Sequence, residues 1–224
     1  MSMSNCPVIA IDGPTASGKG TVAALVAGRL GYHYLDSGAI YRVLAVAVAQ
    51  TGLNPDLSED LKQIIPMAAN LPVQFQGQSI LLQGNDVSEA IRTEEAGVMA
   101  SRLAVVPEIR AGLLARQRDF RQNPGLVADG RDMGSVVFPD SVLKVFLTAS
   151  AQVRAERRVK QIEGRGQSAD FQAIYTDLMT RDKRDTERAV APLKPCEDAL
   201  VLDCSNMPID QVVATIFTWA QERI

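Results

Sequence analysis

The sequence predicts an α/β fold in which a parallel β-sheet is flanked by helices, and three observations support this prediction. Short apolar runs of strand length alternate with longer helical patterns along most of the chain. The chain has 224 residues, of which 46% are hydrophobic and 22% charged, enough to bury a sizeable core. The first apolar run, VIAID, leads through a glycine-rich turn directly into a helical pattern.

The predicted elements follow one another in a regular order. Strands of a buried parallel sheet are expected at 8–11, 32–35, 125–128, 142–147 and 199–202. Helices are expected at 19–30, 39–50, 58–71, 108–122, from about 150, at 169–189 and at 208–223. Ser58 is a candidate N-cap for the third of these helices. Because parallel strands end at one edge of their sheet, the polar residues at strand ends are expected to converge there; they are Asp12, Asp36, Asp129 and Arg131.

A different pattern interrupts this alternation. The segments 73–76 and 79–82 flank Gly77-Gln78, which predicts an antiparallel hairpin with a short turn. A hairpin within a strand–helix chain indicates an inserted subdomain. We expect the insertion to span 73–105, with 1–72 and 106–224 forming the core of a single domain.

The nonapeptide at 13–21 predicts a P-loop that binds a nucleoside triphosphate. Its glycines let backbone N–H groups turn toward phosphate, and the following helix directs its positive dipole end there. The segment reads Gly13-Pro14-Thr15-Ala16-Ser17-Gly18-Lys19-Gly20-Thr21. Lys19 supplies a point charge to the terminal phosphates. Gly20 stands where the strict motif has Ser or Thr, so no direct side-chain ligand for Mg²⁺ is expected, and Thr21 is a candidate to hold the metal through water.

Composition excludes several classes of function. The formal net charge of −3 gives no overall basic field, so no nucleic-acid partner is expected. Three separated cysteines and one histidine show no metal-site spacing, and the cysteines are typical of reduced thiols in a cytosolic protein. The amino-terminal segment has no signal-peptide pattern, and no apolar run approaches the ~20 residues of a membrane span. A cytoplasmic protein without membrane contact is expected.

Arginines gather where a second anionic substrate would bind. Arg42 follows the second predicted strand, and Arg131 follows the third strand beside Asp129 and Asp132. The run 181–188 places Arg181, Asp185 and Arg188 on one helical face. Such arginines suit phosphoryl transfer, although a solvated face with ion pairs would give the same pattern. Arg154, Arg157 and Arg158, before the glycine-flanked Arg165, indicate either a lid over 154–169 or an exposed basic helix.

Several segments together resemble the bacterial cytidylate kinase family, within the P-loop nucleoside monophosphate kinases. They are IDGPTASGKGT at 11–21, LDSGAIYR at 35–42, IRTEEAGVMASRLA at 91–104, VADGRDMGSVVFPD at 127–140, RDKRDTERAVAPL at 181–193 and ALVLD at 199–203. The resemblance implies a P-loop kinase fold with a parallel sheet, a monophosphate-binding insertion of antiparallel strands and helices, and a short lid. It implies transfer of the γ-phosphoryl group of ATP to CMP or dCMP with Mg²⁺, by a protein that is expected to be a monomer.

The resemblance also implies roles for individual residues. The groups that read cytosine fall on Ser37, Ser101, Arg110 and Asp132, and the sugar contacts fall on Arg181 and Asp185. The acceptor phosphate falls on Arg42, Arg131 and Arg188, while ATP is held by 13–21 and Arg157. Lys19, Arg131 and Arg188 are the expected catalytic residues, and Asp129 is a candidate to orient metal-bound water. A carboxylate can accept from cytosine N4, so Asp132 is expected to disfavour UMP.

Two other functions remain open at this level. The chain could be another P-loop small-molecule kinase, acting on UMP, AMP or shikimate. It could also be a non-catalytic switch that binds ATP and presents a conformation to a partner. The arginine set, which suits a second anionic substrate, weighs against the switch.

Overall fold

The computed structural model describes residues 6–76 and 79–224, and the chain divides into two compact units. The sheet unit comprises the chain up to Asp36 together with Phe120–Ile224, and the insert unit comprises Ser37–Asp119. In the described part of the chain, no helix combines the length and the apolar character needed to cross a bilayer.

A parallel β-sheet forms the centre of the sheet unit. Its strands lie in the order β2-β6-β1-β7-β8, and each strand pairs with its neighbours in parallel. Their bounds are β1 Val8–Asp12, β2 His33–Asp36, β6 Leu126–Gly130, β7 Leu143–Thr148 and β8 Leu200–Asp203. Every residue of β1 and β6 is buried, as expected for central strands that are covered on both faces. The predicted α/β fold with a parallel sheet is therefore confirmed.

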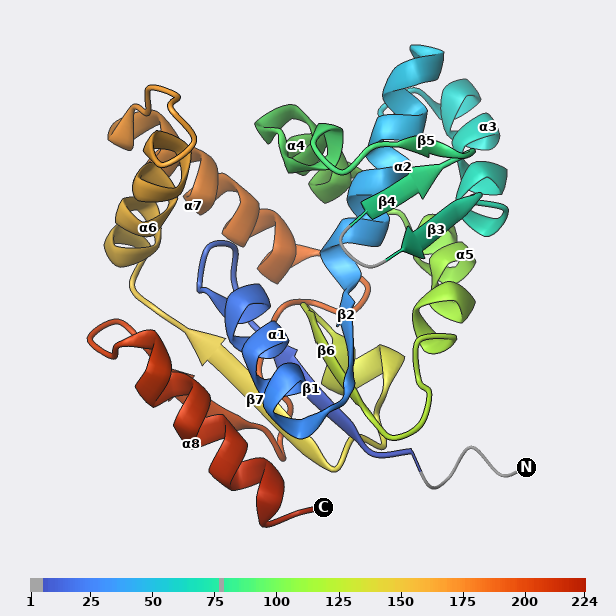
Figure 1. Ribbon diagram of the computed structural model, residues 1–224. Helices are drawn as coiled ribbons and strands as arrows, with labels where there is room; N and C mark the ends of the chain where they lie inside the picture. The colour runs from blue at the N-terminus through green and yellow to red at the C-terminus, as the bar shows by residue number, and fades with distance from the viewer. Residues whose placement is uncertain (1–5, 77–78) are drawn as a thin grey trace. The chain divides into compact units, whose positions relative to one another are not determined.

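Several α-helices accompany this sheet (Figure 1). They are α1 Lys19–Leu30, α6 Ala151–Glu163, α7 Phe171–Glu187 and α8 Ile209–Gln221. Apolar side chains of α1 and α8 form one buried cluster with β1, β6 and β7, including Val26 and Ile216. Helix α6 packs against α7. The side chain of Ser150 caps α6, and that of Asp170 caps α7 by accepting from two backbone N–H groups.

The insert unit combines helices with a small antiparallel sheet. The elements are α2 Ser37–Thr51, α3 Ser58–Ala69, β3 Val73–Gln76, β4 Ser79–Leu82, β5 Asn85–Asp86, the 3₁₀ turn η2 Ala90–Arg92, α4 Glu94–Leu103 and α5 Pro107–Arg118. Helix α2 packs against α4, and α3 packs against α5. The unit is wider than the predicted insertion 73–105 because these helices pack with one another within it.

The local predictions differ from the structure at a few places. Both arms of the hairpin lie as predicted, whereas its turn at 77–78 falls outside the described residues. Ser58 is the first residue of α3 and Leu57 occupies the cap position, so the prediction that Ser58 caps this helix is wrong. A π-helical turn, η3 Met133–Val137, follows β6 and was not predicted. Such turns are rare and occur often at functional sites.

Candidate active site

The P-loop takes the backbone path that its glycines permit. Gly13 lies so close to β7 that a Cβ atom there would be 2.0 Å from the carbonyl oxygen of Leu147. Gly18, at the N-cap of α1, has a φ of 92°, and Ala16 also has a positive φ of 59°. The loop therefore turns tightly between β1 and α1, and the first N–H groups of α1 stay available for an anion.

Lys19, the first residue of α1, lies over this loop. Its Nζ donates to the carbonyl oxygen of Pro14 at 3.3 Å. Burial, together with the neighbouring charge of Arg131, lowers the pKa of Lys19 to about 8 against the opposing effect of Asp129. A bound polyphosphate would reverse this shift, because it would place negative charge beside the ammonium group.

Two arginines of α6 donate hydrogen bonds to backbone carbonyl oxygens of the P-loop. Arg154 donates from Nη1 to the carbonyl oxygen of Thr15 at 3.0 Å and pairs through Nη2 with Asp182 at 2.5 Å. Arg157 donates to the carbonyl oxygens of Ser17 at 3.0 Å and Cys204 at 2.6 Å. Helix α6, the P-loop and the end of β8 are thus joined through guanidinium groups.

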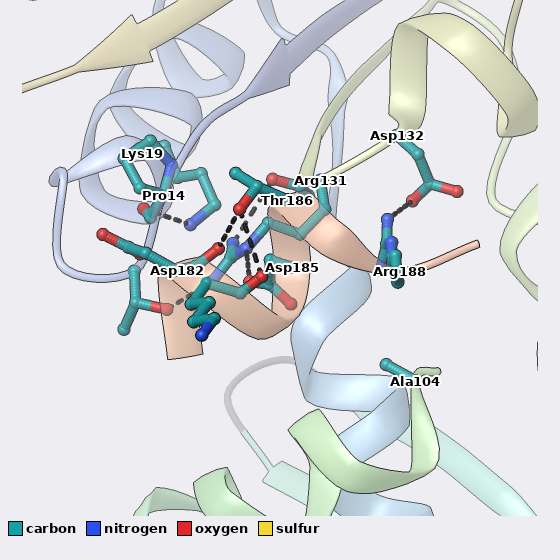
Figure 2. Close-up of polar contacts among 12 residues, drawn as sticks. Pro14, Lys19, Ala104, Arg131, Asp132, Asp182, Asp185, Thr186 and Arg188 are labelled. Carbon is teal, nitrogen blue, oxygen red and sulfur yellow. Dashed lines mark hydrogen bonds and ion pairs between the residues drawn. The ribbon is translucent and has the colours of Figure 1, made fainter. Parts of the chain in front are cut away.

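Arg131 connects the P-loop with α7, as Figure 2 shows. Its Nε pairs with Oδ2 of Asp185 at 2.8 Å, and its Nη2 donates to Oγ1 of Thr15 at 2.6 Å. Burial opposes the charge of this guanidinium, but Asp185 and Asp129 outweigh it and raise the pKa of Arg131. The cation therefore stays charged while held between the P-loop and an acidic residue of α7.

A second group of buried charges lies around the end of α7. Arg181 pairs with Asp177 at 2.8 Å, and burial lowers the pKa of Arg181. Arg188 approaches Asp132, with Nη2 and Oδ1 3.8 Å apart (Figure 2). Asp132, Arg181, Asp185 and Arg188 are all buried. The prediction of one shared helical face is wrong for Arg188, because α7 ends at Glu187 and the backbone of Arg188 is extended.

The strand ends converge as predicted at one edge of the sheet. Asp36 on β2 is paired in register with Asp129 on β6, and Asp12 on β1 with Gly130. Burial and the neighbouring Asp36 raise the pKa of Asp129 to about 7. This carboxyl group therefore sits where a cation would relieve repulsion between two acids.

Tyr34 is a site residue that the sequence reasoning missed. Its hydroxyl donates to Oδ1 of Asp129 at 2.8 Å, and burial with the nearby acids raises the pKa of Tyr34. A Cβ atom on Gly20 would lie 3.4 Å from this hydroxyl and 3.7 Å from Oδ2 of Asp129. Tyr34 is half-buried, between the exposed His33 and the buried Leu35. No pattern in the sequence of β2 indicates that its hydroxyl bonds Asp129.

Asp12 is a second residue whose side-chain partners were not predicted. Its carboxylate accepts from the backbone N–H groups of Met133 at 2.8 Å and Gly134 at 2.9 Å. These are the first two residues of η3, directly after Asp132. In the sequence, only its place at a strand end pointed to the site.

The remaining predicted residues lie in the insert unit, on three of its helices. Ser37 is the buried first residue of α2, and Arg42 on the same helix donates to the carbonyl oxygen of Ile91 at 3.0 Å. Ser101 lies half-buried on α4. Arg110 is buried on α5 and donates to the carbonyl oxygen of Ala104 at 3.2 Å. Within this unit, α2 packs against both α4 and α5.

Two candidate metal contacts differ in their surroundings. Thr21 is exposed on α1, whereas Asp129 is buried. Among residues 6–76 and 79–224, no group of three or more His, Cys, Asp or Glu side chains is arranged to enclose a metal ion. Asp129 and its hydrogen-bond donor Tyr34 lie beside the start of α1, where both approach Gly20.

Comparison with known proteins gives one consistent family. The family model described as "Cytidylate kinase" matches residues 9–222. A protein named "Cytidylate kinase" from Aeromonas salmonicida is 53% identical over 223 residues, covering 97% of this chain and 95% of that protein. One of the same name from Polynucleobacter asymbioticus is 54% identical over 222 residues, covering 99% and 100%.

A solved structure supports the fold alone. The crystal structure of an uncharacterized protein from Eubacterium ventriosum aligns with a TM-score of 0.53 at 14% identity, covering 97% of this chain and 99% of that one. The family match spans nearly the whole chain, including the P-loop, the Asp129–Asp132 loop and α7. The chain therefore belongs to the cytidylate kinase family.

Proposed function

We propose that this protein transfers the γ-phosphoryl group of ATP to CMP or dCMP, giving ADP and CDP or dCDP. The observation that carries this proposal is the contact of the P-loop with a buried arginine–carboxylate cluster. Arg131 bonds both Thr15 of the P-loop and Asp185 of α7. One guanidinium thus lies between the place for a triphosphate and residues suited to a second anionic substrate.

The donor side of the proposed site is the P-loop, residues 13–21. Backbone N–H groups at the start of α1 would bind the phosphates, and Lys19 would neutralise the β- and γ-phosphoryl oxygens. Arg157 would act at ATP while it holds the carbonyl of Ser17. A proposed lid at 154–169 would exclude water from the transferring group.

The acceptor CMP would be bound through three sets of residues. Its phosphate would be held by Arg42, Arg131 and Arg188, cytosine by Ser37, Ser101, Arg110 and Asp132, and the sugar by Arg181 and Asp185. The Asp132 carboxylate can accept from cytosine N4, where uracil instead presents an acceptor oxygen. Asp132 and Arg188, whose nearest charged atoms are 3.8 Å apart, are both buried, so the proposed contacts to the base and to the acceptor phosphate lie side by side.

The chemical step depends on the positioning of the two substrates and requires no covalent bond to the protein. An oxygen of the CMP phosphate attacks the γ-phosphorus, the bond from that phosphorus to the bridging β–γ oxygen breaks, and ADP leaves with the electron pair. The nucleophile is already an anion, so no general base is required. Lys19, Arg131 and Arg188 would hold the mutually repelling groups in line and stabilise charge on the transferring group.

The residues at the strand ends fit Mg²⁺ held through water. Mg²⁺ prefers oxygen ligands and keeps several of its waters. Asp129 offers a buried carboxylate whose raised pKa reflects burial and repulsion by Asp36, and a cation would offset both effects. Asp129, with Tyr34 and Thr21 near the same loop, would hold metal-bound water. When bound, Mg²⁺ would neutralise charge on the phosphates and help to orient them.

The proposal also includes the cellular location and the oligomeric state of the protein. A cytoplasmic location fits the three cysteines, none of which takes part in a disulfide in the described residues. A monomer is the oligomeric state expected for the family. Sedimentation of the pure protein with and without both nucleotides would test the monomer.

A coupled assay of ADP release tests the function. CMP, dCMP, UMP, AMP and shikimate are offered singly with ATP and Mg²⁺. Rapid turnover with CMP or dCMP is expected. Preferred turnover of AMP or shikimate would contradict the proposal, and ATP binding without turnover of any acceptor would indicate a switch. Asp132→Ala should lose the preference for CMP over UMP; a retained preference would remove Asp132 from base recognition.

A further inference from the structure

Asp12 joins two loops that the proposed function assigns to different substrates. It is the last residue of β1, so its backbone leads directly into Gly13 of the P-loop. Its buried carboxylate uses one oxygen for the N–H of Met133, at 2.8 Å, and the other for the N–H of Gly134, at 2.9 Å. The same residue therefore starts the donor loop and binds the loop after β6.

These two bonds act on the backbone directly after Asp132. The short η3 turn begins at Met133, and the carbonyl oxygen of Asp132 accepts from the N–H groups of Val136 and Val137. The N–H groups at the start of such a turn have no partner within it. Asp12 supplies these partners and thereby holds the turn that follows Asp132.

The same turn is also held by close packing at Gly134. A Cβ atom on Gly134 would lie 3.1 Å from Cγ and Cδ of Lys144 and 3.4 Å from Sγ of Cys196. Only glycine fits there without displacing a neighbour. The turn is thus held both by hydrogen bonds to Asp12 of β1 and by side chains that pack on Gly134.

The two N–H donors explain why an acid suits this buried position. Burial raises the pKa of Asp12 to about 6, the two backbone N–H groups lower it, and Asp132 and Lys19 act in opposite directions with smaller effects. A carboxylate presents acceptors on both oxygens, which the two N–H donors require. An amide of the same shape would place an NH₂ group against one of these donors.

We propose that Asp12 is a positioning residue for acceptor recognition, which sets the place of Asp132 relative to the P-loop. This inference rests on the proposed function, in which Asp132 reads cytosine. Asp12 touches neither substrate in this role. It acts through the backbone of Met133 and Gly134, and so it controls selectivity for the base.

The first test compares Asp12→Asn with a matched control, Asp170→Asn. Asp170 also accepts from two backbone N–H groups, at 2.8 and 3.1 Å, but both bond its Oδ1, which Asn would keep, and it caps α7 at an exposed position. Asp12→Asn is expected to raise KM for CMP about tenfold or more, as the loss of a hydrogen bond to a charged group implies, and to lower the CMP-over-UMP ratio similarly. KM for ATP should change by less than about twofold, below the effect of one lost hydrogen bond. Asp170→Asn should leave the CMP-over-UMP ratio unchanged.

A second pair of variants displaces the same turn without altering Asp12. Gly134→Ala places a methyl group against the side chain of Lys144 and should also raise KM for CMP and lower selectivity against UMP. Adding Lys144→Ala removes the Cγ and Cδ atoms in the way. The double variant should therefore recover most of the selectivity that Gly134→Ala loses. This pair decides the matter if Asp12→Asn does not fold, as judged by circular dichroism and thermal melting.

The outcomes separate this inference from the proposed function. If the unaltered protein does not phosphorylate CMP, the proposed function fails. If it does, and Asp132→Ala loses selectivity while Asp12→Asn and Gly134→Ala keep it, the positioning role is overturned and the proposed function stands. Equal rises of KM for CMP and ATP in Asp12→Asn would also overturn it, because they would indicate general damage to the loops.

Discussion

The hydroxyl of Tyr34 donates a 2.8 Å hydrogen bond to Oδ1 of Asp129, and this hydroxyl lies 3.4 Å from the place of a Cβ on Gly20. A strict P-loop carries Ser or Thr at that position, with its hydroxyl directed at the metal. Here a hydroxyl beside that space comes from β2 rather than from α1. This relationship leads to predictions about the Mg²⁺ dependence of the reaction.

Tyr34→Phe should raise the Mg²⁺ concentration that catalysis requires. The variant keeps the ring but removes the donor that orients Asp129, a loss expected to cost about 1–3 kcal/mol, or roughly fivefold to 150-fold in the Mg²⁺ concentration for half-maximal rate. Activity is measured against Mg²⁺ at saturating nucleotides, with calorimetry of Mg²⁺–ATP binding beside it. Tyr32→Phe is the matched control, because the Tyr32 ring packs on Gly125 away from the P-loop. An unchanged Mg²⁺ dependence in Tyr34→Phe would contradict this role of the hydroxyl.

Gly20→Ser should restore part of this function in the Tyr34→Phe background. The Ser side chain would occupy the space that the Tyr34 oxygen has left, since that oxygen lies only 3.4 Å from the new Cβ. It would also supply the hydroxyl of the strict motif. Recovery is measured by the same Mg²⁺ titration. If the double variant needs as much Mg²⁺ as Tyr34→Phe, the hydroxyl introduced by Gly20→Ser does not replace that of Tyr34.

Lys19 should take up a proton when ATP binds at about pH 8.5, because burial and Arg131 lower the pKa of Lys19 to about 8 in the free protein. At that pH much of the free protein carries a neutral amine, and the triphosphate favours the charged form. Calorimetry in buffers of different ionisation enthalpy measures the uptake. Lys19→Met should show none and should bind ATP about tenfold to a hundredfold more weakly, as the loss of a charge-assisted contact implies. Equal uptake in both proteins would assign the proton to another group.

Asp129→Asn should stabilise the folded protein at about pH 8 while it lowers activity. Burial and Asp36 raise the pKa of Asp129 to about 7 in the folded state, above the ordinary value of 3.8. The folded state therefore holds the proton more tightly than the unfolded state. This group's contribution to the free energy of unfolding is present below about pH 4 and is lost as the pH rises to about 7.

The gain in the Asn variant should be on the order of 2 kcal/mol at about pH 8 and should shrink toward pH 4. Urea denaturation across this range measures it. Asp210→Asn, at an exposed position in the first turn of α8, is the control and should show no comparable trend. A loss of stability at about pH 8 in Asp129→Asn would contradict the expected sign of the effect.

Gly13→Ala should destabilise the protein severely, whereas Gly28→Ala should stabilise it slightly. The new Cβ at position 13 would lie 2.0 Å from the backbone oxygen of Leu147, which cannot move without disturbing β7, so a loss above about 3 kcal/mol is expected. At position 28 no atom beyond the neighbouring residues and the helix's own backbone lies within 4 Å of the new methyl group, and alanine in a helix gains about 0.5–1 kcal/mol over glycine. Thermal and urea unfolding compare the two. Similar stability of both variants would contradict the expectation that the close approach of Gly13 to Leu147 excludes a side chain.

Arg157→Ala should raise KM for ATP about tenfold, because the P-loop loses a charged donor at the carbonyl of Ser17. Arg121→Ala is the matched control. Arg121 also donates to a backbone carbonyl, that of Cys6, and pairs with Asp140, but the carbonyl it holds lies before β1 rather than after it. Both variants should lose some stability, and only Arg157→Ala should weaken ATP binding. A rise in KM for ATP in both would indicate a general loss of packing.

Much of the fold could be predicted because it depends on local patterns. The apolar runs of β1 and β6, the helix after Lys19 and the two arms of the hairpin all lie within a few residues of their predicted bounds. The order of motifs also indicated the family, since each motif is a continuous segment. The errors have local causes as well: η3 is a five-residue turn without a repeating pattern, and Arg188 follows the helix end at Glu187.

By itself, the sequence determined the α/β alternation, the P-loop and the edge of the sheet where polar residues converge, because hydrophobic period and glycine placement act within short segments. The tertiary structure alone decided which groups meet there. Asp12 reaches Met133 across 121 positions, Tyr34 reaches Asp129 across 95, and Arg157 reaches Ser17 across 140. A pattern of neighbouring residues carries no information on such partners, because the packing of the sheet and α6 brings them within hydrogen-bond distance only in the folded protein.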